Sequence, residues 1–170
     1  MPIIKEKVLK VEHYTDRLFH ITTTRDPSIR SRDGEFLMIG IMLDDKPLLR
    51  AYSVASPSHQ DTMEFFSIKV PGGPLTSRLQ YIKPGDELLV NSKVVGTLVC
   101  DNLKPGRNLY LMGTGTGVAP FLSVARGVEV YENYDNVILL WGARTVAELP
   151  FVDYWDQLNE DEIYGELAQG

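Results

Sequence analysis

The chain has 170 residues, a formal net charge of −6 at pH 7, and 44% hydrophobic and 24% charged residues. This composition is ordinary for a folded globular chain and excludes a largely disordered one. The acidic balance argues against nucleic acid as a partner, and no apolar run approaches the roughly 18–20 residues that a membrane helix needs.

Cysteine and histidine usage excludes several kinds of metal centre. The one cysteine, Cys100, cannot form an intramolecular disulfide, a four-cysteine iron–sulfur cluster or a CxxC zinc site. The histidines His13, His20 and His59 are scattered without metal-ligand spacing, so we expect structural or surface roles and no metal. The N-terminal residues 1–7 lack the apolar region of a signal peptide, which predicts a cytoplasmic protein that does not associate with membranes.

The first part of the chain, residues 1–102, is rich in short runs of β-branched and aromatic residues separated by turn signals such as Asp44–Pro47 and Lys83–Asp86. Six or seven strands at this spacing predict an antiparallel barrel or sandwich. One helix, at about residues 75–81, interrupts them. The expected strands are residues 3–11, 18–24, 35–43, 48–54, 63–70, 87–90 and 97–99.

The pattern changes at Lys104-Pro105-Gly106, where a second domain, residues 103–170, is expected to begin. A strand at 108–112, a glycine-rich loop, a helix at 118–127 and a strand at 137–141 form a βαβ unit, which begins a parallel sheet. A further helix is expected at residues 147–159. Only two strands are supplied, whereas such sheets usually have about five or six, so this α/β domain is either incomplete or unusually small.

The segment 50–53 combines an arginine, a tyrosine and a serine on one expected strand. Arg50 offers a bidentate fork for a pyrophosphate, Tyr52 a flat face for an isoalloxazine ring, and Ser53 a hydrogen bond near flavin N5. The same residues are also compatible with a strand that carries a surface arginine and a core tyrosine.

Two glycine-rich segments each precede an expected helix. Residues 72–77, Gly-Gly-Pro-Leu-Thr-Ser, bring N–H groups and hydroxyls together where an anion binds, although they also suit an ordinary helix N-cap. The run Gly113-Thr114-Gly115-Thr116-Gly117 lies between a strand and a helix, the context of a dinucleotide-binding turn. Its strictly alternating glycines differ from the GxGxxG pattern, but they allow a pyrophosphate or a nicotinamide to approach the backbone.

The second expected parallel strand ends at Trp141-Gly142-Ala143-Arg144. Arg144 therefore lies at the carboxyl ends of the strands, where ligands of open α/β sheets bind. An arginine here, in place of an acidic residue for a ribose hydroxyl, favours NADP over NAD. A solvated surface arginine is the alternative.

With these motifs in order, the chain resembles the bacterial ferredoxin/flavodoxin–NADP reductase family. The resemblance is carried by Arg-x-Tyr-Ser at residues 50–53, by residues 65–70 and 73–79, and by GTGTG-x-AP-F at residues 113–121. It implies a six-stranded antiparallel FAD-binding barrel, residues 1–102, followed by a partial α/β NADP-binding lobe. It also implies hydride transfer from NADPH to FAD and single-electron delivery to ferredoxin or flavodoxin, by an enzyme expected to be a monomer.

The resemblance also implies a role for individual residues. Arg50 would bind the FAD pyrophosphate, Tyr52 would stack on the flavin and Ser53 would lie near N5, while Thr116 would lie where nicotinamide meets flavin. Tyr52, Ser53 and Thr116 are therefore the expected catalytic residues. Leu75, Thr76 and Ser77 would contact the phosphates and Arg144 the 2′-phosphate. The further expected cofactor-binding residues are Ala51, Ser67, Ile68, Lys69, Gly73, Gly113, Thr114, Gly115, Gly117 and Ala143.

Family members continue beyond this chain's end with further strands of the NADP lobe, so we expect a chain truncated at its C-terminus. The alternative function is therefore a flavin-binding module that does not turn over. An oxygenase reductase with a fused iron–sulfur domain is excluded by the single cysteine. A basic patch for an acidic electron carrier is conceivable from Arg25, Arg30, Arg32, Arg78, Lys93 and Arg107, although the chain as a whole is acidic.

Overall fold

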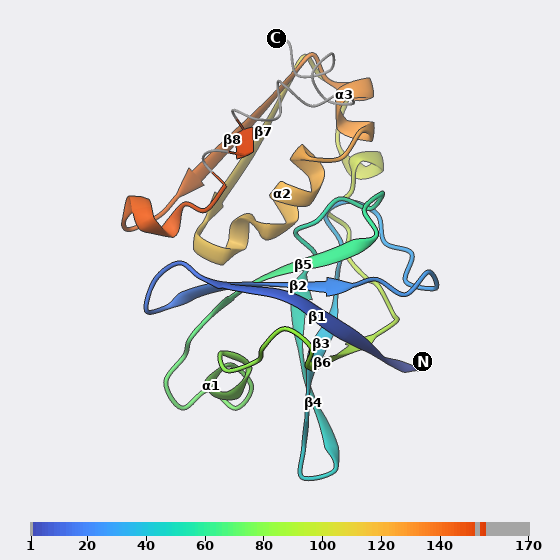
Figure 1. The fold of residues 1–170 in the computed structure, drawn as a ribbon. Coiled ribbons are helices and arrows are strands. Elements are labelled where there is room, and N and C mark those ends of the chain that lie inside the picture. The colour runs from blue at the N-terminus through green and yellow to red at the C-terminus, as the bar shows by residue number, and fades with distance from the viewer. Residues whose placement is uncertain (1, 152–153, 156–170) are drawn as a thin grey trace.

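The computed structural model describes residues 2–151 and 154–155. They form two lobes (Figure 1): a barrel lobe made of strands β1–β6 with helix α1, and a parallel lobe made of strands β7 and β8 with helices α2 and α3. No described helix is both long and apolar enough to cross a bilayer. The bounds are β1 Ile3–His13, β2 Leu18–Thr24, β3 Phe36–Leu43, β4 Lys46–Ser53, β5 Thr62–Ile68, α1 Thr76–Leu79, β6 Glu87–Asn91, β7 Asn108–Thr114, α2 Ala119–Ala125, α3 Glu129–Asn133 and β8 Asn136–Gly142.

The barrel lobe is one antiparallel sheet of six strands in the order β4-β3-β6-β1-β2-β5. The sheet curls until its two edge strands approach each other. The backbone N–H of Ala55, just after β4, donates to the carbonyl of Glu64 on β5 at 2.8 Å, and the hydroxyls of Tyr52 and Ser67 are hydrogen-bonded at 2.8 Å. The predicted antiparallel barrel is confirmed.

The barrel interior is apolar, and α1 packs against it. Phe19, Leu37, Ile39 and Phe65 are fully buried inside it, as the alternation of side chains along a strand requires. Leu79, from α1, packs into the same cluster and so attaches the helix to the barrel core. This packing explains why a helix of only four residues holds its place between two longer loops.

Strands β2 and β5 are buried on both faces. On β2, Phe19 and Ile21 face the barrel interior, while Leu18 and His20, which alternate with them, lie beneath the parallel lobe. Phe66 occupies the same outer face on β5. Val118, Ala119 and Leu122 pack against this face, so the lobes share an apolar seam. The ribbon of α2 lies over β2 and β5 there (Figure 1).

The parallel lobe confirms the predicted βαβ unit, because β7 and β8 pair in parallel and α2 connects them on one face. A 3₁₀ turn, Gly115–Val118, precedes α2, so the regular helix is shorter than the expected residues 118–127. The short helix α3 was not expected from the sequence. Its apolar residue Val130 is buried against the same face of the sheet as α2.

Two sequence predictions are wrong. Residues 97–99 do not form a strand: the chain leaves the sheet after an isolated bridge between Phe36 and Val95, and leads into the 3₁₀ turn Cys100–Asn102. The helix expected at 147–159 is also wrong at its start. Val146–Glu148 form a 3₁₀ turn and Pro150, which lacks an N–H donor, lies in the non-helical segment after it. Tyr154 and Trp155 are helical, and residues 152–153 and 156–159 lie outside the described residues.

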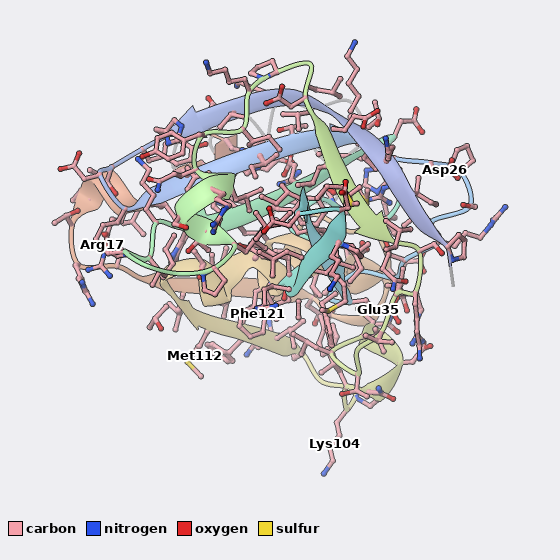
Figure 2. The ribbon with its side chains drawn as sticks, turned by 90° about the horizontal axis from the view of Figure 1, so that it is seen from below. Arg17, Asp26, Glu35, Lys104, Met112 and Phe121 are labelled. Atoms are coloured by element: carbon pink, nitrogen blue, oxygen red, sulfur yellow. The ribbon has the colours of Figure 1, made fainter. Side chains whose placement is uncertain are left out.

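The face of β7 and β8 turned away from α2 is apolar and exposed. Tyr110 is 56% exposed, Met112 66% and Leu140 49%. Met112 points outward from the molecule, whereas Phe121 lies towards its interior (Figure 2). Parallel sheets are usually covered on both faces. The apolar side chains on the outer face of β7 and β8 are typical of a face that another element covers.

The seam supports a stability prediction with a matched control. Replacing Leu122, which is fully buried between the lobes, by alanine is expected to lower the free energy of unfolding by about 2–5 kcal/mol, because it leaves a cavity. The same substitution at the exposed Leu140 is expected to cost less than about 1 kcal/mol. Urea denaturation of both variants measures the difference, and equal losses would contradict a packed seam.

Candidate functional site

A first cleft of about 350 Å³ opens where the end of β4 and strand β5 meet the parallel lobe. The cleft therefore lies at the seam between the lobes. Its walls come from both: β4, β5 and α1 on the barrel side, and the 3₁₀ turn with the start of α2 on the other. The lining residues are Arg50, Ala51, Tyr52, Ser53, Phe66, Ser67, Ile68, Thr76, Thr116, Gly117 and Ala119.

Strand β4 places its polar side chains at this cleft. Arg50 is exposed, and its guanidinium donates to the carbonyl of Leu49 at 2.8 Å. The Tyr52 ring is held by its hydroxyl against Ser67 and lies edge-on to Phe65, with ring centroids 6.5 Å apart. Burial raises the pKa of Tyr52, so the phenol stays neutral. The cleft thus offers a fixed aromatic ring beside an exposed cation.

The loop before α1 brings Thr76 to the same cleft. Its hydroxyl accepts a hydrogen bond from the backbone N–H of Val70 at 3.3 Å, and the backbone N–H of Gly73 donates to the carbonyl of Val70 at 3.0 Å. These bonds tie the start of α1 to the end of β5. Thr76 is therefore fixed opposite the end of β4.

The loop between β7 and α2 is shaped by two glycines. Gly115 has φ of 52°, a conformation that favours glycine, and its carbonyl accepts a hydrogen bond from the indole N–H of Trp141 at 3.2 Å. At Gly113 a Cβ atom would lie 2.8 Å from the Cα of Val118, so only glycine lets the strand and the turn approach this closely. The loop is thus held on two sides.

A second cleft of about 500 Å³ lies at the carboxyl ends of β7 and β8. This is the position at which open α/β sheets bind ligands. Thr116 and Ile68 line both clefts, so the two adjoin there. The lining residues are Arg17, Leu18, Ile68, Thr114, Gly115, Thr116, Gly142, Ala143, Arg144 and Glu148.

Most of the expected site residues lie at these clefts. Arg50, Ala51, Tyr52, Ser53, Ser67, Ile68, Thr76, Thr116 and Gly117 line the first, and Thr114, Gly115, Ala143 and Arg144 line the second. Lys69, Gly73, Leu75, Ser77 and Gly113 line neither. Leu75 is buried in the barrel core, and the Lys69 ammonium lies 3.5 Å from the carbonyl of Thr15.

Several lining residues were not expected from the sequence. Phe66 and Ala119 line the first cleft, and Arg17, Leu18, Gly142 and Glu148 the second. The sequence does mark Phe66, because it lies within a motif that carries the family resemblance. Arg17 belongs to the turn between β1 and β2, and it reaches the second cleft only through the docking of the lobes.

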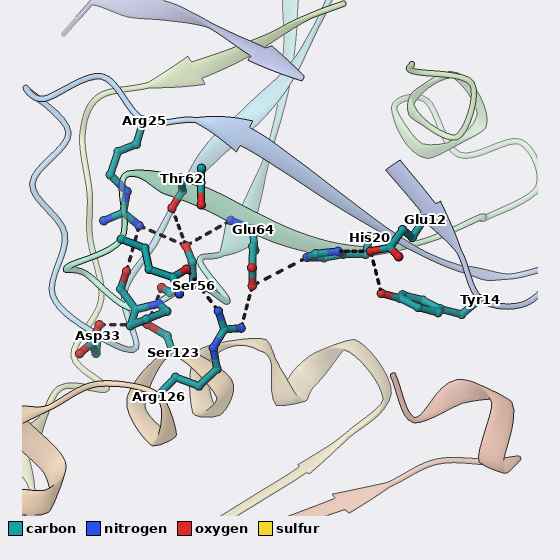
Figure 3. A network of polar contacts seen from close by, with 12 residues as sticks. Glu12, Tyr14, His20, Arg25, Asp33, Ser56, Thr62, Glu64, Ser123 and Arg126 are labelled. Carbon is teal, nitrogen blue, oxygen red and sulfur yellow. Dashed lines mark hydrogen bonds and ion pairs between the residues drawn. The ribbon is translucent and has the colours of Figure 1, made fainter. Parts of the chain in front are cut away.

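A chain of polar and charged groups crosses the seam (Figure 3). Arg126, at the C-terminal end of α2, forms an ion pair with Glu64 of β5 at 2.7 Å. The His20 ring lies between two carboxylates, with Nε2 3.9 Å from Glu64 and Nδ1 3.7 Å from Glu12. The Tyr14 hydroxyl donates to Glu12 at 3.4 Å. We call these five residues the seam network.

A second polar cluster lies beside the seam network (Figure 3). The Ser123 hydroxyl of α2 donates to the carbonyl of Ser56 at 3.0 Å and lies 3.3 Å from the carboxylate of Asp33. Asp33 also accepts the backbone N–H of Ser58 at 2.6 Å. Burial raises the pKa of Asp33. These contacts attach the middle of α2 to loops of the barrel lobe.

No group of three or more potential metal ligands occurs among the residues that the structure describes. Cys100 is a free, half-buried thiol, and burial raises its pKa to about 11. The thiol is therefore protonated at neutral pH.

The described residues thus form a curled antiparallel barrel joined to a strand–loop–helix–strand lobe, with adjoining clefts at the seam. The family described as "Oxidoreductase FAD-binding domain" matches residues 4–98, more than half of the chain. The chain therefore belongs to the oxidoreductase FAD-binding domain family.

The chain is also similar to individual proteins with reductase names. The chain is 55% identical over 165 residues to a ferredoxin–NADP reductase of Pseudomonas aeruginosa, an alignment covering 96% of this chain and 64% of the relative. It is 50% identical to a flavodoxin/ferredoxin–NADP reductase of Rhodobacter capsulatus, covering 97% and 62%. A crystal structure of a Neisseria gonorrhoeae ferredoxin NADP⁺ reductase with bound FAD and NADP superposes with a TM-score of 0.87 at 31% identity, covering 94% and 65%. The chain thus spans less than two thirds of the length of these relatives.

The seam network supports a prediction about pH. Burial lowers the pKa of His20, while the carboxylates of Glu64 and Glu12 act in the opposite direction. The folded chain then binds the His20 proton less tightly than the unfolded chain, so stability is complete above the unfolded pKa of about 6.5 and falls as pH drops below it. Between pH 7.5 and 5.5 we expect a loss of about 1 kcal/mol from this group.

The measurement is urea denaturation at both pH values. His20→Gln is expected to remove most of the loss, and His59→Gln, at an exposed histidine outside the seam network, to retain it. An unchanged loss in His20→Gln would show that other groups cause the pH dependence.

Proposed function

We propose that the chain is the FAD-binding barrel and the beginning of the NADP-binding lobe of an oxidoreductase that transfers electrons between NADPH and ferredoxin or flavodoxin. The observation that carries the proposal is the meeting of the two clefts at Thr116 and Ile68. Two cofactors that exchange a hydride must touch at their reacting rings. Adjoining clefts with one shared wall meet that requirement.

The first cleft has the donors that FAD needs. Arg50 would bind the pyrophosphate, and the Tyr52 ring would stack on the flavin. Ser53, which lines the cleft, would hydrogen-bond near N5, and Ser67 holds the tyrosine hydroxyl. Leu75, Thr76 and Ser77 would contact the phosphates through backbone or hydroxyl groups, and the proposed site also includes Ala51, Ile68, Lys69 and Gly73.

The second cleft has the donors that NADP(H) needs. The loop Gly113–Gly117 lets a nicotinamide nucleotide approach the backbone, and Arg144 would bind a 2′-phosphate. Ala143 lies beside that arginine at the end of β8.

Bound FAD would supply a two-electron acceptor that also passes on single electrons. The residues of this chain orient the two cofactors and exclude water from their junction. Thr116 forms the shared wall, and the side chains of Val118 and Ala119, both buried, close the seam behind it. The Tyr52 ring, fixed by Ser67, keeps the stacking face in place. Tyr52, Ser53 and Thr116 are the residues that we propose to touch the reacting rings.

We also propose a domain boundary at residues 102 and 103, where the 3₁₀ turn Cys100–Asn102 leads towards β7. The names of the relatives support ferredoxin or flavodoxin as the electron carrier. We further propose that the protein is a monomer and lies in the cytoplasm. A free cysteine supports the cytoplasm, because free thiols are usual in a reducing compartment.

One alternative is favoured by a specific observation. The chain spans less than two thirds of its relatives, and the outer face of β7 and β8 is apolar and exposed. A chain whose parallel lobe has two described strands could bind FAD in the first cleft, which the barrel mainly forms, without presenting NADPH at the second. The chain would then be a flavin-binding module.

The role of Arg50 can be tested by affinity. Arg50→Ala is expected to weaken FAD binding about 10- to 150-fold, which corresponds to the loss of charge-assisted hydrogen bonds to the pyrophosphate. Arg107→Ala provides the control, because that side chain is 81% exposed and pairs with Asp135 away from both clefts. Quenching of FAD fluorescence on titration gives the two dissociation constants. Equal weakening in both variants would contradict the assigned role.

The activity itself is tested by adding NADPH to the FAD-loaded chain without oxygen and recording the visible spectrum. Loss of the oxidised flavin absorption is expected if the second cleft presents the nicotinamide to the flavin. Saturable FAD binding without this loss would support the flavin-binding module. An absence of FAD binding would contradict both readings.

A further inference from the structure

Helix α2 is attached to the barrel lobe at its C-terminal end by charge. Arg126, only 2% exposed, donates to Glu64 of β5 at 2.7 Å and to the side-chain carbonyl of Gln60 at 3.3 Å. Its guanidinium also lies over the rings of Phe151 and Tyr154, at 5.6 and 5.1 Å from their centroids. The arginine is therefore held from several sides at the seam.

The other end of α2 begins at the clefts. Ala119, its first residue, lines the first cleft, and the preceding turn carries Thr116, which lines both. A helix of seven residues is about 10 Å long, so Arg126 and the turn that carries Thr116 lie at the two ends of one short helix. We therefore expect a shift or tilt at Arg126 to move that turn as well.

Strand β5 has the same arrangement on the barrel side. Glu64 lies at the seam, and Ser67 and Ile68, at the end of the same strand, line the first cleft. The Glu64–Arg126 pair thus joins the two elements whose ends form opposite walls of the proposed cofactor junction.

We propose that Glu64 and Arg126 are positioning residues: their ion pair sets the distance and angle between the loop carrying Thr116 and the flavin-facing end of β5. This inference rests on the proposed function for its effect on hydride transfer. Its structural part, that the pair holds the two walls together, stands without any cofactor.

A directional, charge-assisted bond suits this task better than apolar packing does. The apolar seam around Leu122 and Phe66 favours contact between the lobes, but the hydrophobic effect behind it is not directional. The bond between Arg126 and Glu64 fixes one donor against one acceptor with little room for translation. Reaction rates are sensitive to such displacements, since a misplacement of about 1 Å can lower a rate about 100-fold.

Trp141 provides a reporter that needs neither cofactor nor turnover. Its ring packs edge-on against Phe66 across the seam at 6.1 Å, and its indole N–H donates to the carbonyl of Gly115 in the cleft loop. The chain has two tryptophans, so a Trp155→Phe background makes Trp141 the single source of tryptophan emission. Quenching of this emission by acrylamide measures access to the seam.

The experiment compares Glu64→Gln, Arg126→Met and the double variant in the Trp155→Phe background. In the apo chain each is expected to raise the acrylamide quenching constant about twofold, and the double variant to add little more, as for two residues acting as one unit. Glu87→Gln is the control, because its pair with Lys5 is exposed and remote from the seam. Arg126→Lys, which keeps the cation, is expected to restore part of the wild-type behaviour.

In the FAD-loaded chain the same variants are expected to bleach the flavin with NADPH about 10- to 100-fold more slowly, with FAD affinity within about twofold of the parent. A residue that only stabilised the fold would leave this rate unchanged well below the melting temperature. Wild-type quenching together with a wild-type rate in Glu64→Gln and Arg126→Met would overturn the proposal. If the parent chain itself fails to bleach, the proposed function fails, while the quenching comparison still decides whether the pair positions the walls.

Discussion

The outer face of strands β2 and β5 is the surface on which the rest of the molecule depends. Antiparallel sheets often expose one face to water. Here that outer face of β2 and β5 carries the apolar side chains of Leu18 and Phe66. Covering them with Val118 and Leu122 removes a large apolar area from water at about 25 cal/mol per Å². The parallel lobe is therefore held where the barrel needs a cover, and both proposed cofactor sites follow from that placement.

The clefts form where this cover ends. At the end of β4 the sheet curls towards β5 without full pairing, so Arg50 and Tyr52 stay accessible beside a closed seam. On the other lobe the glycine loop leaves the gap open, because Gly115 and Gly117 line the clefts and have no side chains to fill them. The result is an opening bounded by polar groups on one side and bare backbone on the other, which suits a planar ring with a phosphate tail.

Much of this arrangement could be predicted from the sequence, because it follows from local patterns. Alternating apolar residues mark β1 to β6, and the glycine loop between a strand and a helix marks the parallel lobe. Residues 97–99 have the composition of a strand and lack a partner strand, which composition does not reveal. Arg17 reaches the second cleft, and Arg126 reaches Glu64 across 62 positions of sequence, only through the docking of the lobes. No local pattern marks such contacts.

The seam network raises the question why a buried interface contains charge at all. Burying an arginine and a glutamate is costly, and well-packed apolar residues often stabilise a protein as much or more. An apolar pair in place of Glu64 and Arg126 would leave His20 beside Glu12 alone and would remove the directional bonds that Arg126 donates to Glu64 and Gln60. Our proposal explains the retained charge by placement: the pair specifies one alignment of α2 on β5, and the width of the proposed cofactor junction depends on that alignment.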